Sequence, residues 1–211
     1  MINRTIKLLM LSDIFIATGF GLTDPIVAIY IKENLTGGTI FAAGLASTIF
    51  LVTKSVVQLP FSRYVDGHDD KIRWLIIGTF LIALVPFIYI LANDIKYIYF
   101  AQLLHGLGSG LAFPTWLGLW TTHLDKKHQS FEWSLYSTFT GLGIASSAAI
   151  GATIAQMFGF VYTFILVGSM SMVGCFILFA LEKANTHKYA NHGHITHYHY
   201  KRKTHPGSRY H

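Results

Sequence analysis

The sequence predicts an all-α polytopic membrane protein with six transmembrane helices. Hydrophobic residues make up 52% of the 211-residue chain and charged residues only 12%, about half of the roughly 25% that is usual in soluble domains. The apolar residues fall into runs of about 20, the length of a helix that crosses a bilayer. Lysine and arginine gather in the short stretches between these runs and at the end of the chain, as the positive-inside rule requires.

The predicted spans are separated by short polar connections. They are Ile6–Ile31, Ile40–Phe61, Trp74–Ala92, Tyr97–Trp120, Phe131–Met157 and Phe160–Leu181. Because the connections are short, consecutive helices should pack as antiparallel neighbours. We therefore expect residues 1–183 to form one six-helix transmembrane bundle and residues 184–211 to form a separate tail. The run after Arg4 is too long for a signal peptide and is expected to be retained as a span.

Basic residues alternate between the two predicted faces. They stand before the first span and after the second, fourth and sixth, whereas the other face has only Lys32 and Lys96. This pattern predicts a multi-pass protein of the cell membrane with both termini in the cytoplasm. It also accounts for the net charge of +6, so nucleic acid is not an expected partner.

An internal repeat links the first and fourth spans. Gly19–Pro25 and Gly108–Pro114 share the pattern Gly-x-Gly-Leu-x-x-Pro and lie 89 residues apart (114 minus 25). The same shift places the second and third spans near the fifth and sixth, which predicts two three-helix units of inverted topology with a site near mid-membrane. The glycines of the motif are also expected to let a second six-helix unit pack closely against this one, with the first and fourth spans at the interface between the two.

The turn between the second and third spans contains a loop motif. In the major facilitator superfamily of transporters this loop reads Gly-x-x-x-Asp-(Arg/Lys)-x-Gly-x-(Arg/Lys)-(Arg/Lys). Here Ser62 stands at the first glycine, Asp66 at the aspartate, and Lys71 with Arg73 at the basic end. The chain resembles that family, although Gly67 and Asp69 depart from its pattern.

The resemblance implies a fold, an activity and a partner. The fold is the amino-terminal six-helix half of a major facilitator transporter. The activity is secondary transport of a small-molecule substrate by alternating access, and the partner is a second six-helix unit, either another copy or a separate half. Many proton-coupled members carry Arg-x-x-Gln-Gly in the fourth span, where this chain reads Gln102-Leu-Leu-His105-Gly106. If a proton is carried, His105 or Asp24 must therefore carry it.

Asp13 and Lys54 are expected at one depth on adjacent antiparallel helices. Ionisable groups inside a bilayer need a partner or a function. We therefore expect a structural ion pair between them, with or without a part in transport.

Asp24 and His105 are expected to share a second depth, nearer the outer face. The resemblance places the first and fourth helices along the central cavity, so Asp24, Gln102, His105 and Trp116 are the candidate substrate and proton-pathway residues. The alternative is structural: Asp24 caps the helix break at Pro25, and His105 is hydrogen-bonded in packing. Other aromatic residues near span ends, Tyr89 and Tyr136 among them, are predicted interface anchors.

The fifth span carries small residues at four-residue spacing, namely Gly143, Ser147, Gly151 and Ala155. This stripe predicts close contact with a neighbouring helix.

The tail is rich in histidine and basic residues and has almost no aliphatic residue. Such a composition predicts a disordered segment. Three interpretations stay open: a basic tail on anionic lipid, a weak site for zinc, nickel or copper, and a broken reading frame. The metal site would use His192, His194, His197 and His199.

Transport is thus the function that the sequence favours, and a non-transporting membrane interaction protein or truncated half is the alternative. No enzyme is expected, because no nucleophile with a base partner is visible. No P-loop and no cofactor motif is visible either.

Overall fold

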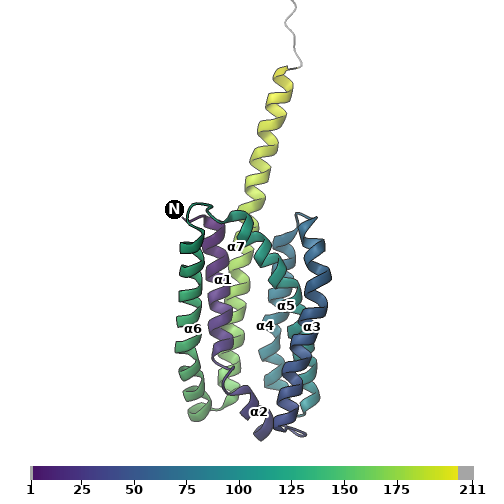
Figure 1. The fold of residues 1–211 in the computed structure, drawn as a ribbon, viewed down its shortest axis with the longest axis vertical. Coiled ribbons are helices and arrows are strands. Elements are labelled where there is room, and N and C mark those ends of the chain that lie inside the picture. Colours follow the sequence, from purple (N-terminus) through teal and green to yellow (C-terminus); the bar gives the residue numbers. More distant parts are fainter. Residues whose placement is uncertain (1, 204–211) are drawn as a thin grey trace, which may run out of the picture.

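The computed structural model describes the backbone of residues 2–203 and the side chains of residues 2–183. Every regular element in this part of the chain is a helix (Figure 1). The helices are α1 Arg4–Gly21, α2 Val27–Asn34, α3 Ile40–Asp66, α4 Lys71–Leu91, α5 Ile95–His123, α6 Gln129–Phe158 and α7 Phe160–Lys203. The predicted all-α class is confirmed.

The first predicted span is divided into α1 and α2 by a tight turn. The amides of Thr23 and Asp24 both donate to the carbonyl of Phe20, at 2.9 and 3.0 Å. The Thr23 hydroxyl donates to the same carbonyl at 3.0 Å. Pro25 follows, and its ring carries no N–H with which to continue a helical ladder. The chain therefore changes direction at the motif that the sequence singles out.

Four helices in the described part of the chain are long and apolar enough to cross a membrane. They are α3, α4, α6 and the Phe160–Lys183 part of α7. The first and fourth predicted spans are not among them. α1 carries Arg4, Lys7 and Asp13 among its 18 residues, and α5 carries glycines together with Gln102 and His105, which lower its hydropathy.

α7 continues beyond the bundle (Figure 1). The sequence predicts the last span to end at Leu181 and an unfolded tail to follow, but the backbone stays helical as far as Lys203. Helix propagation adds one backbone hydrogen bond for each residue that is fixed, which composition alone does not take into account.

Three helices begin at capping side chains. The carboxamide of Asn3 accepts from Thr5 N at 3.1 Å, and the Thr39 hydroxyl accepts from Ala42 N at 3.0 Å. The Asp94 carboxylate accepts from Lys96 N at 2.9 Å. Each cap satisfies an amide that the first helical turn leaves without a partner.

The bundle consists of two groups of helices. α1, α6 and α7 pack together on one side, and α3, α4 and α5 pack together on the other (Figure 1). Contact between α4 and α7 joins the groups. Each group therefore mixes helices from both halves of the chain, since α5 lies with α3 and α4, and α1 lies with α6 and α7.

The space beside each glycine of the repeated motif is filled by another helix of this bundle. A Cβ at Gly19 would face α7, and one at Gly21 would meet Ser147 and Ile144 of α6. A Cβ at Gly108 would meet α4, and one at Gly110 would meet α3. The expectation that these glycines admit a second unit is therefore wrong, because neighbouring helices of the same chain already fill the space.

The small-residue stripe of α6 packs against α1 and the turn after it. A Cβ at Gly143 would meet the Thr18 hydroxyl, and one at Gly151 would meet the backbone of Leu22. Close helix contact, which the sequence predicts at this stripe, is present in the structure.

Two apolar clusters fill the two ends of the bundle. One contains the start of α1, the start of α4 and the end of α5, including Ile6, Leu75 and Trp120. The other contains α2, the end of α4 and the start of α5, including Ile31, Tyr89 and Ile98. The candidate site borders the first cluster.

Candidate functional site

A cavity of about 170 Å³ lies among the helices, towards the end of the bundle that holds the N-terminus. Six helices line it, namely α1, α3, α4, α5, α6 and α7. Its polar wall is formed by Ser12, Asp13, Lys54, Thr79, Ser109 and Tyr136. The rest of the wall is apolar. A cavity of this kind can hold a small solute against both polar and apolar groups.

Asp13 is tied to α6. Its carboxylate Oδ2 accepts a hydrogen bond from the Tyr136 hydroxyl at 2.6 Å. This distance is in the range of hydrogen bonds from a hydroxyl to an ionised acceptor. The bond connects residues 123 positions apart, so no local sequence pattern predicts it.

Lys54 faces aromatic rings. Its Nζ lies 5.0 Å from the centre of the Phe113 ring and 6.0 Å from that of Phe50, within reach of a cation–π interaction. Among the described side chains the ion pairs are Arg73 with Glu182 and Asp125 with His128. The expected ion pair between Asp13 and Lys54 is therefore not formed, although both residues line the same cavity. Equal depth brings them to one site, but Tyr136 and Phe113 are their partners.

Trp116 lies on the cavity wall, where the sequence places it among the candidate residues. It stacks on Trp120 with ring centres 4.9 Å apart and contacts Tyr136 at 5.1 Å. Trp116 is buried, and its indole Nε1 has no hydrogen-bond partner among the described residues. An unused donor therefore remains in the wall.

The other candidate residues lie outside the wall of this cavity. His105 is sandwiched between Phe20 and Phe50, with ring centres at 4.7 and 4.4 Å. Gln102 Nε2 donates to the Tyr89 hydroxyl at 2.9 Å, and its Oε1 is buried without a partner in the described structure. Asp24 is exposed and lies close enough to Tyr89 to interact with it electrostatically.

The sequence therefore groups residues that the fold separates. Trp116 belongs with Asp13 and Lys54, whereas Asp24 and Gln102 share Tyr89 as a neighbour. Tyr89 and Tyr136 are predicted interface anchors, but both hydroxyls bond to side chains inside the bundle. Their chemistry depends on the helices opposite, which aromatic position within a span does not specify.

The loop motif joins α3 to α4. Ser62 and Asp66 lie in the last turns of α3, and the Ser62 hydroxyl donates to the carbonyl of Leu59 at 2.8 Å. Lys71 is the first residue of α4. Arg73 Nε lies 3.4 Å from the Glu182 carboxylate, which connects α4 to α7.

Asp70 provides a further contact in this turn that the motif does not include. Its carboxylate accepts from Trp74 Nε1 at 2.9 Å and from the Tyr64 hydroxyl at 3.3 Å.

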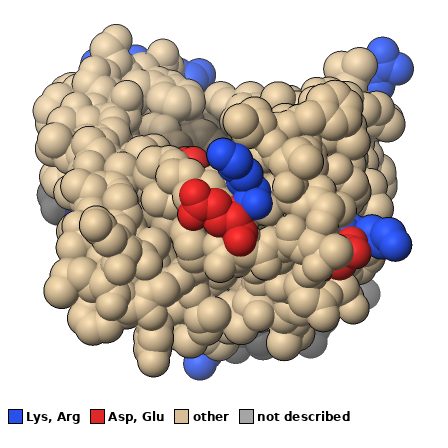
Figure 2. Space-filling model, turned by 90° about the horizontal axis from the view of Figure 1, so that it is seen from below, with Lys and Arg blue, Asp and Glu red and all other residues tan. Residues whose placement is uncertain are grey.

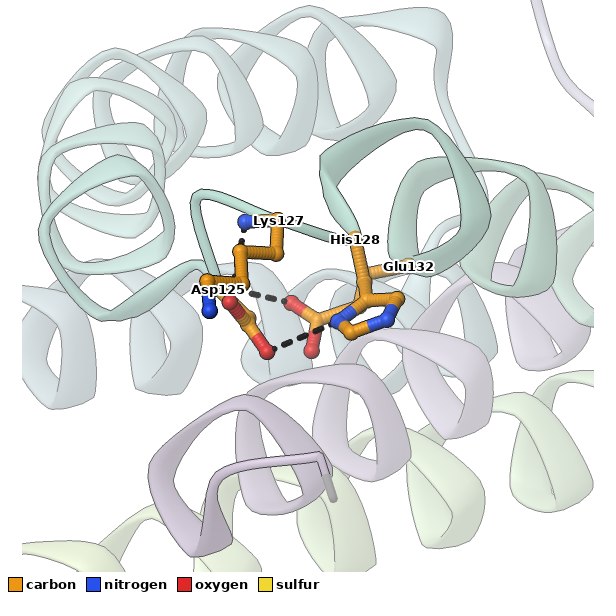
Figure 3. A network of polar contacts seen from close by, with 4 residues as sticks. All are labelled: Asp125, Lys127, His128 and Glu132. Atoms are coloured by element: carbon orange, nitrogen blue, oxygen red, sulfur yellow. Dashed lines mark hydrogen bonds and ion pairs between the residues drawn. The ribbon is translucent and has the colours of Figure 1, made fainter.

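The loop between α5 and α6 is held by carboxylates (Figure 3). Asp125 accepts from Lys127 N at 3.0 Å and lies 3.0 Å from His128 Nδ1. The Asp125 amide donates to the buried Glu132 carboxylate at 3.3 Å. The hydrogen bonds with His128 and with the Lys127 amide hold the pKa of Asp125 below its ordinary value.

Metal binding is predicted only in the tail. The side chains of His192, His194, His197 and His199 lie outside the described residues. Within the described part, no group of three or more histidine, cysteine, aspartate or glutamate side chains is placed to hold a metal ion.

The fold and cavity define a class. Helices long and apolar enough to cross a membrane line a cavity whose mostly apolar wall also contains a carboxylate, a lysine and hydroxyl groups. This is the architecture of a polytopic helical membrane protein that handles small solutes.

The chain belongs to the Major Facilitator Superfamily, whose sequence profile matches residues 9–200. It is a transmembrane protein of a transport family.

Individual relatives are distant. The chain is similar to the quinolone resistance protein NorA of Staphylococcus aureus, with 22% identity over 157 residues, covering 74% of this chain and 39% of that protein. It is also similar to the uncharacterized MFS-type transporter MJ1560 of Methanocaldococcus jannaschii, with 23% identity over 160 residues, covering 75% and 40%. The chain thus spans about two fifths of the length of these relatives.

A solved structure shares the fold. The crystal structure of the POT family transporter PepTSo superimposes with a TM-score of 0.67 at 14% sequence identity, over 85% of this chain and 37% of that one.

Proposed function

We propose that this chain is one six-helix unit of a secondary transporter, equivalent to the amino-terminal half of the family fold. It moves a small solute by alternating access through the central cavity. The observation that carries the proposal is the cavity itself, with a carboxylate, a lysine and hydroxyl groups contributed by different helices. Polar groups at this depth are costly unless they serve a solute or a partner. No cofactor is required for this activity.

Packing supports the two inverted three-helix units. Gly19 faces α7 and Gly108 faces α4, while Gly21 faces α6 and Gly110 faces α3. A two-fold operation that exchanges the halves of the chain converts each contact into its counterpart. The helix pairs follow the same rule, since α1 packs on α6 and α7 as α5 packs on α3 and α4.

A second six-helix unit would cover the outward faces of α3 and α6. Of the most apolar 18-residue stretch in each helix, 17% is buried in α3 and 11% in α6, against 50% in α4 and 44% in α7. α3 and α6 also lie at opposite edges of the bundle (Figure 1). The unit would be another copy of this chain or a separate half.

Both termini would be cytoplasmic. The N-terminus, the α3–α4 and α5–α6 loops and the extension of α7 lie at one end of the bundle (Figure 1), and these segments hold most of the lysine and arginine. At the opposite end, acidic and basic side chains lie beside one another in the middle of the face (Figure 2). The positive-inside rule assigns the basic end to the cytoplasm.

Asp24 is the better of the two candidates for an outer proton-pathway residue. It is exposed and interacts electrostatically with Tyr89, whose hydroxyl accepts a hydrogen bond from Gln102. His105 is enclosed by two aromatic rings, a position suited to packing.

Cysteine accessibility tests alternating access without knowledge of the substrate. Ser109 on the cavity wall becomes cysteine in a Cys175→Ala background, and membrane-impermeant thiol reagents are applied to intact cells and to inverted vesicles. Modification from both sides is expected. A cysteine at Phe176, an exposed apolar position on α7, is the control and should react from neither side. Modification of Ser109→Cys from one side only, under all conditions, would favour a membrane protein that does not transport.

Crosslinking tests the second unit. Cysteines at Val52 of α3 and Leu142 of α6, both more than half exposed, should crosslink to a second copy in native membranes, whereas Phe176→Cys should not. Monomer alone, with the protein still abundant, would rule out the second copy and leave a separate half as the partner.

A further inference from the structure

The cavity wall contains a carboxyl group and an ammonium group that form no ion pair with each other. Asp13 bonds to the hydroxyl of Tyr136, and Lys54 faces the ring of Phe113. Neither partner carries a formal charge. Because charged groups shielded from water need compensation, each one favours a ligand group of the opposite sign.

The two charges face one space. Both side chains line the same cavity, so one ligand that fills it can contact both. A solute with only a cation would satisfy Asp13 and repel Lys54, and one with only an anion would do the reverse. A solute that carries both charges satisfies both residues at once.

The size and the walls of the cavity restrict the class of ligand further. Its volume of about 170 Å³ is well below the roughly 300–1,000 Å³ of sites for drug-sized ligands. Ile16, Phe113 and Trp116 form part of the apolar wall.

We infer that the cavity binds a small zwitterion of amino-acid size with an apolar body, whose ammonium group lies at Asp13 and whose carboxylate lies at Lys54. This inference rests on the proposed transport function and specifies the substrate class for its cavity.

The first experiment measures binding to the full chain in lipid nanodiscs. The ligands are glycine, alanine, valine, leucine and phenylalanine, and the signal is displacement of a tritiated member of the series. The tightest ligand is then compared with two analogues that each lack one charge. For leucine these are 3-methylbutylamine, without the carboxylate, and 4-methylpentanoate, without the ammonium group. Each analogue is expected to bind roughly tenfold or more weakly than the zwitterion.

The second experiment assigns each charge to its residue. In Asp13→Asn the advantage of leucine over 4-methylpentanoate should disappear, while its advantage over 3-methylbutylamine persists. In Lys54→Met the opposite pattern is expected. Asp69→Asn and Lys126→Met remove the same charges at exposed loop positions and should leave both ratios unchanged. Ratios within one variant are unaffected by a uniform loss of folded protein.

The outcomes separate this inference from the proposed function. Absence of binding across the whole series, or analogues as tight as the zwitterion, overturns the inference. So does a loss of both ratios together in either variant. If Ser109→Cys is still modified from both membrane sides, the transport proposal stands and only the substrate class is wrong. If it is modified from one side only, the transport proposal fails, whatever the cavity binds.

Discussion

The first and fourth membrane segments carry the same motif but fold differently. Gly19–Pro25 ends α1 and begins a turn, so this segment is two helices. Gly108–Pro114 lies inside α5, which runs without interruption from Ile95 to His123. In α5 the Thr115 hydroxyl donates to the carbonyls of Leu111 and Ala112, at 2.8 and 2.7 Å, and partners the backbone beside the proline. Proline therefore permits a break in this bundle but does not require one.

Equivalent positions on the two helices also differ in charge. Asp13 and Gln102 are 89 residues apart (102 minus 13), the offset of the repeat. Each forms a hydrogen bond with a tyrosine hydroxyl, Asp13 with Tyr136 and Gln102 with Tyr89. Only Asp13 lines the cavity. One helix of the pair thus carries the charged group of the site, and the other carries a neutral counterpart.

The largest expected difference is at the equivalent glycines Gly108 and Gly19. A Cβ at Gly108 would lie 2.7 Å from the backbone oxygen of Gly78, so Gly108→Ala must push α4 and α5 apart. We expect a loss of about 1–3 kcal/mol in stability, towards the upper end. At Gly19 the nearest atom would be Met170 Cβ at 3.3 Å. Because alanine favours helix, Gly19→Ala should stay within about 1 kcal/mol of the native protein.

The measurement is thermal unfolding in detergent, followed with a dye that reacts with the buried thiol of Cys175. Gly141→Ala is the control for helix propensity, since a Cβ there meets nothing within 4 Å. Equal losses at Gly108 and Gly19 would show that α1 and α5 are packed alike.

A second difference is expected between the two tyrosines. Tyr136→Phe leaves the Asp13 carboxylate without its hydrogen-bond donor, which should cost about 1.5–3 kcal/mol. Tyr89→Phe removes a bond to a neutral carboxamide and should cost about 1 kcal/mol. Both changes delete one oxygen, so each serves as the other's control in the same assay. A larger loss for Tyr89→Phe would contradict the assignment of the charged site to the α1 side.

The smallest expected difference lies in the loops that follow the two helices. After α2, the backbone of Thr36 bonds to Asn93 and Ile95 at 3.0 and 3.1 Å, a pairing without titratable groups. After α5, the loop depends on Asp125, whose pKa is lowered in the folded state. A carboxyl group whose pKa is lower in the folded state stabilises the fold at pH values above its pKa in the unfolded chain, about 3.9. This stabilisation is lost as the pH falls through the pKa of the folded state.

We therefore expect Asp125→Asn to lower Tm slightly at pH 6, and we expect the two proteins to converge as the pH falls below about 4. Thr36→Val, which keeps the backbone pairing, should show no such convergence. A difference between native protein and Asp125→Asn that persists unchanged to pH 3 would show that the carboxylate does not hold the loop.

The sequence by itself determined the all-helical class and its membrane setting. Both follow from hydrophobic content and from runs of bilayer length, which are local properties of the chain. The loop motif and the Gly-x-Gly-Leu-x-x-Pro repeat are also local. Each glycine of the repeat packs against a neighbouring helix, which explains why glycine stands in both copies.

Only the tertiary structure decided which side chains share a site. Depth along a span can be counted from the sequence, but rotation about the helix axis and the choice of neighbour cannot. Asp13 and Lys54 are therefore correctly placed at one level, yet Tyr136 and Phe113 are their contacts. α5 packs with α3 and α4, and α1 packs with α6 and α7, so the cavity is formed between segments far apart in the chain. Those contacts arise from the packing of whole helices, a property that no single stretch of sequence contains.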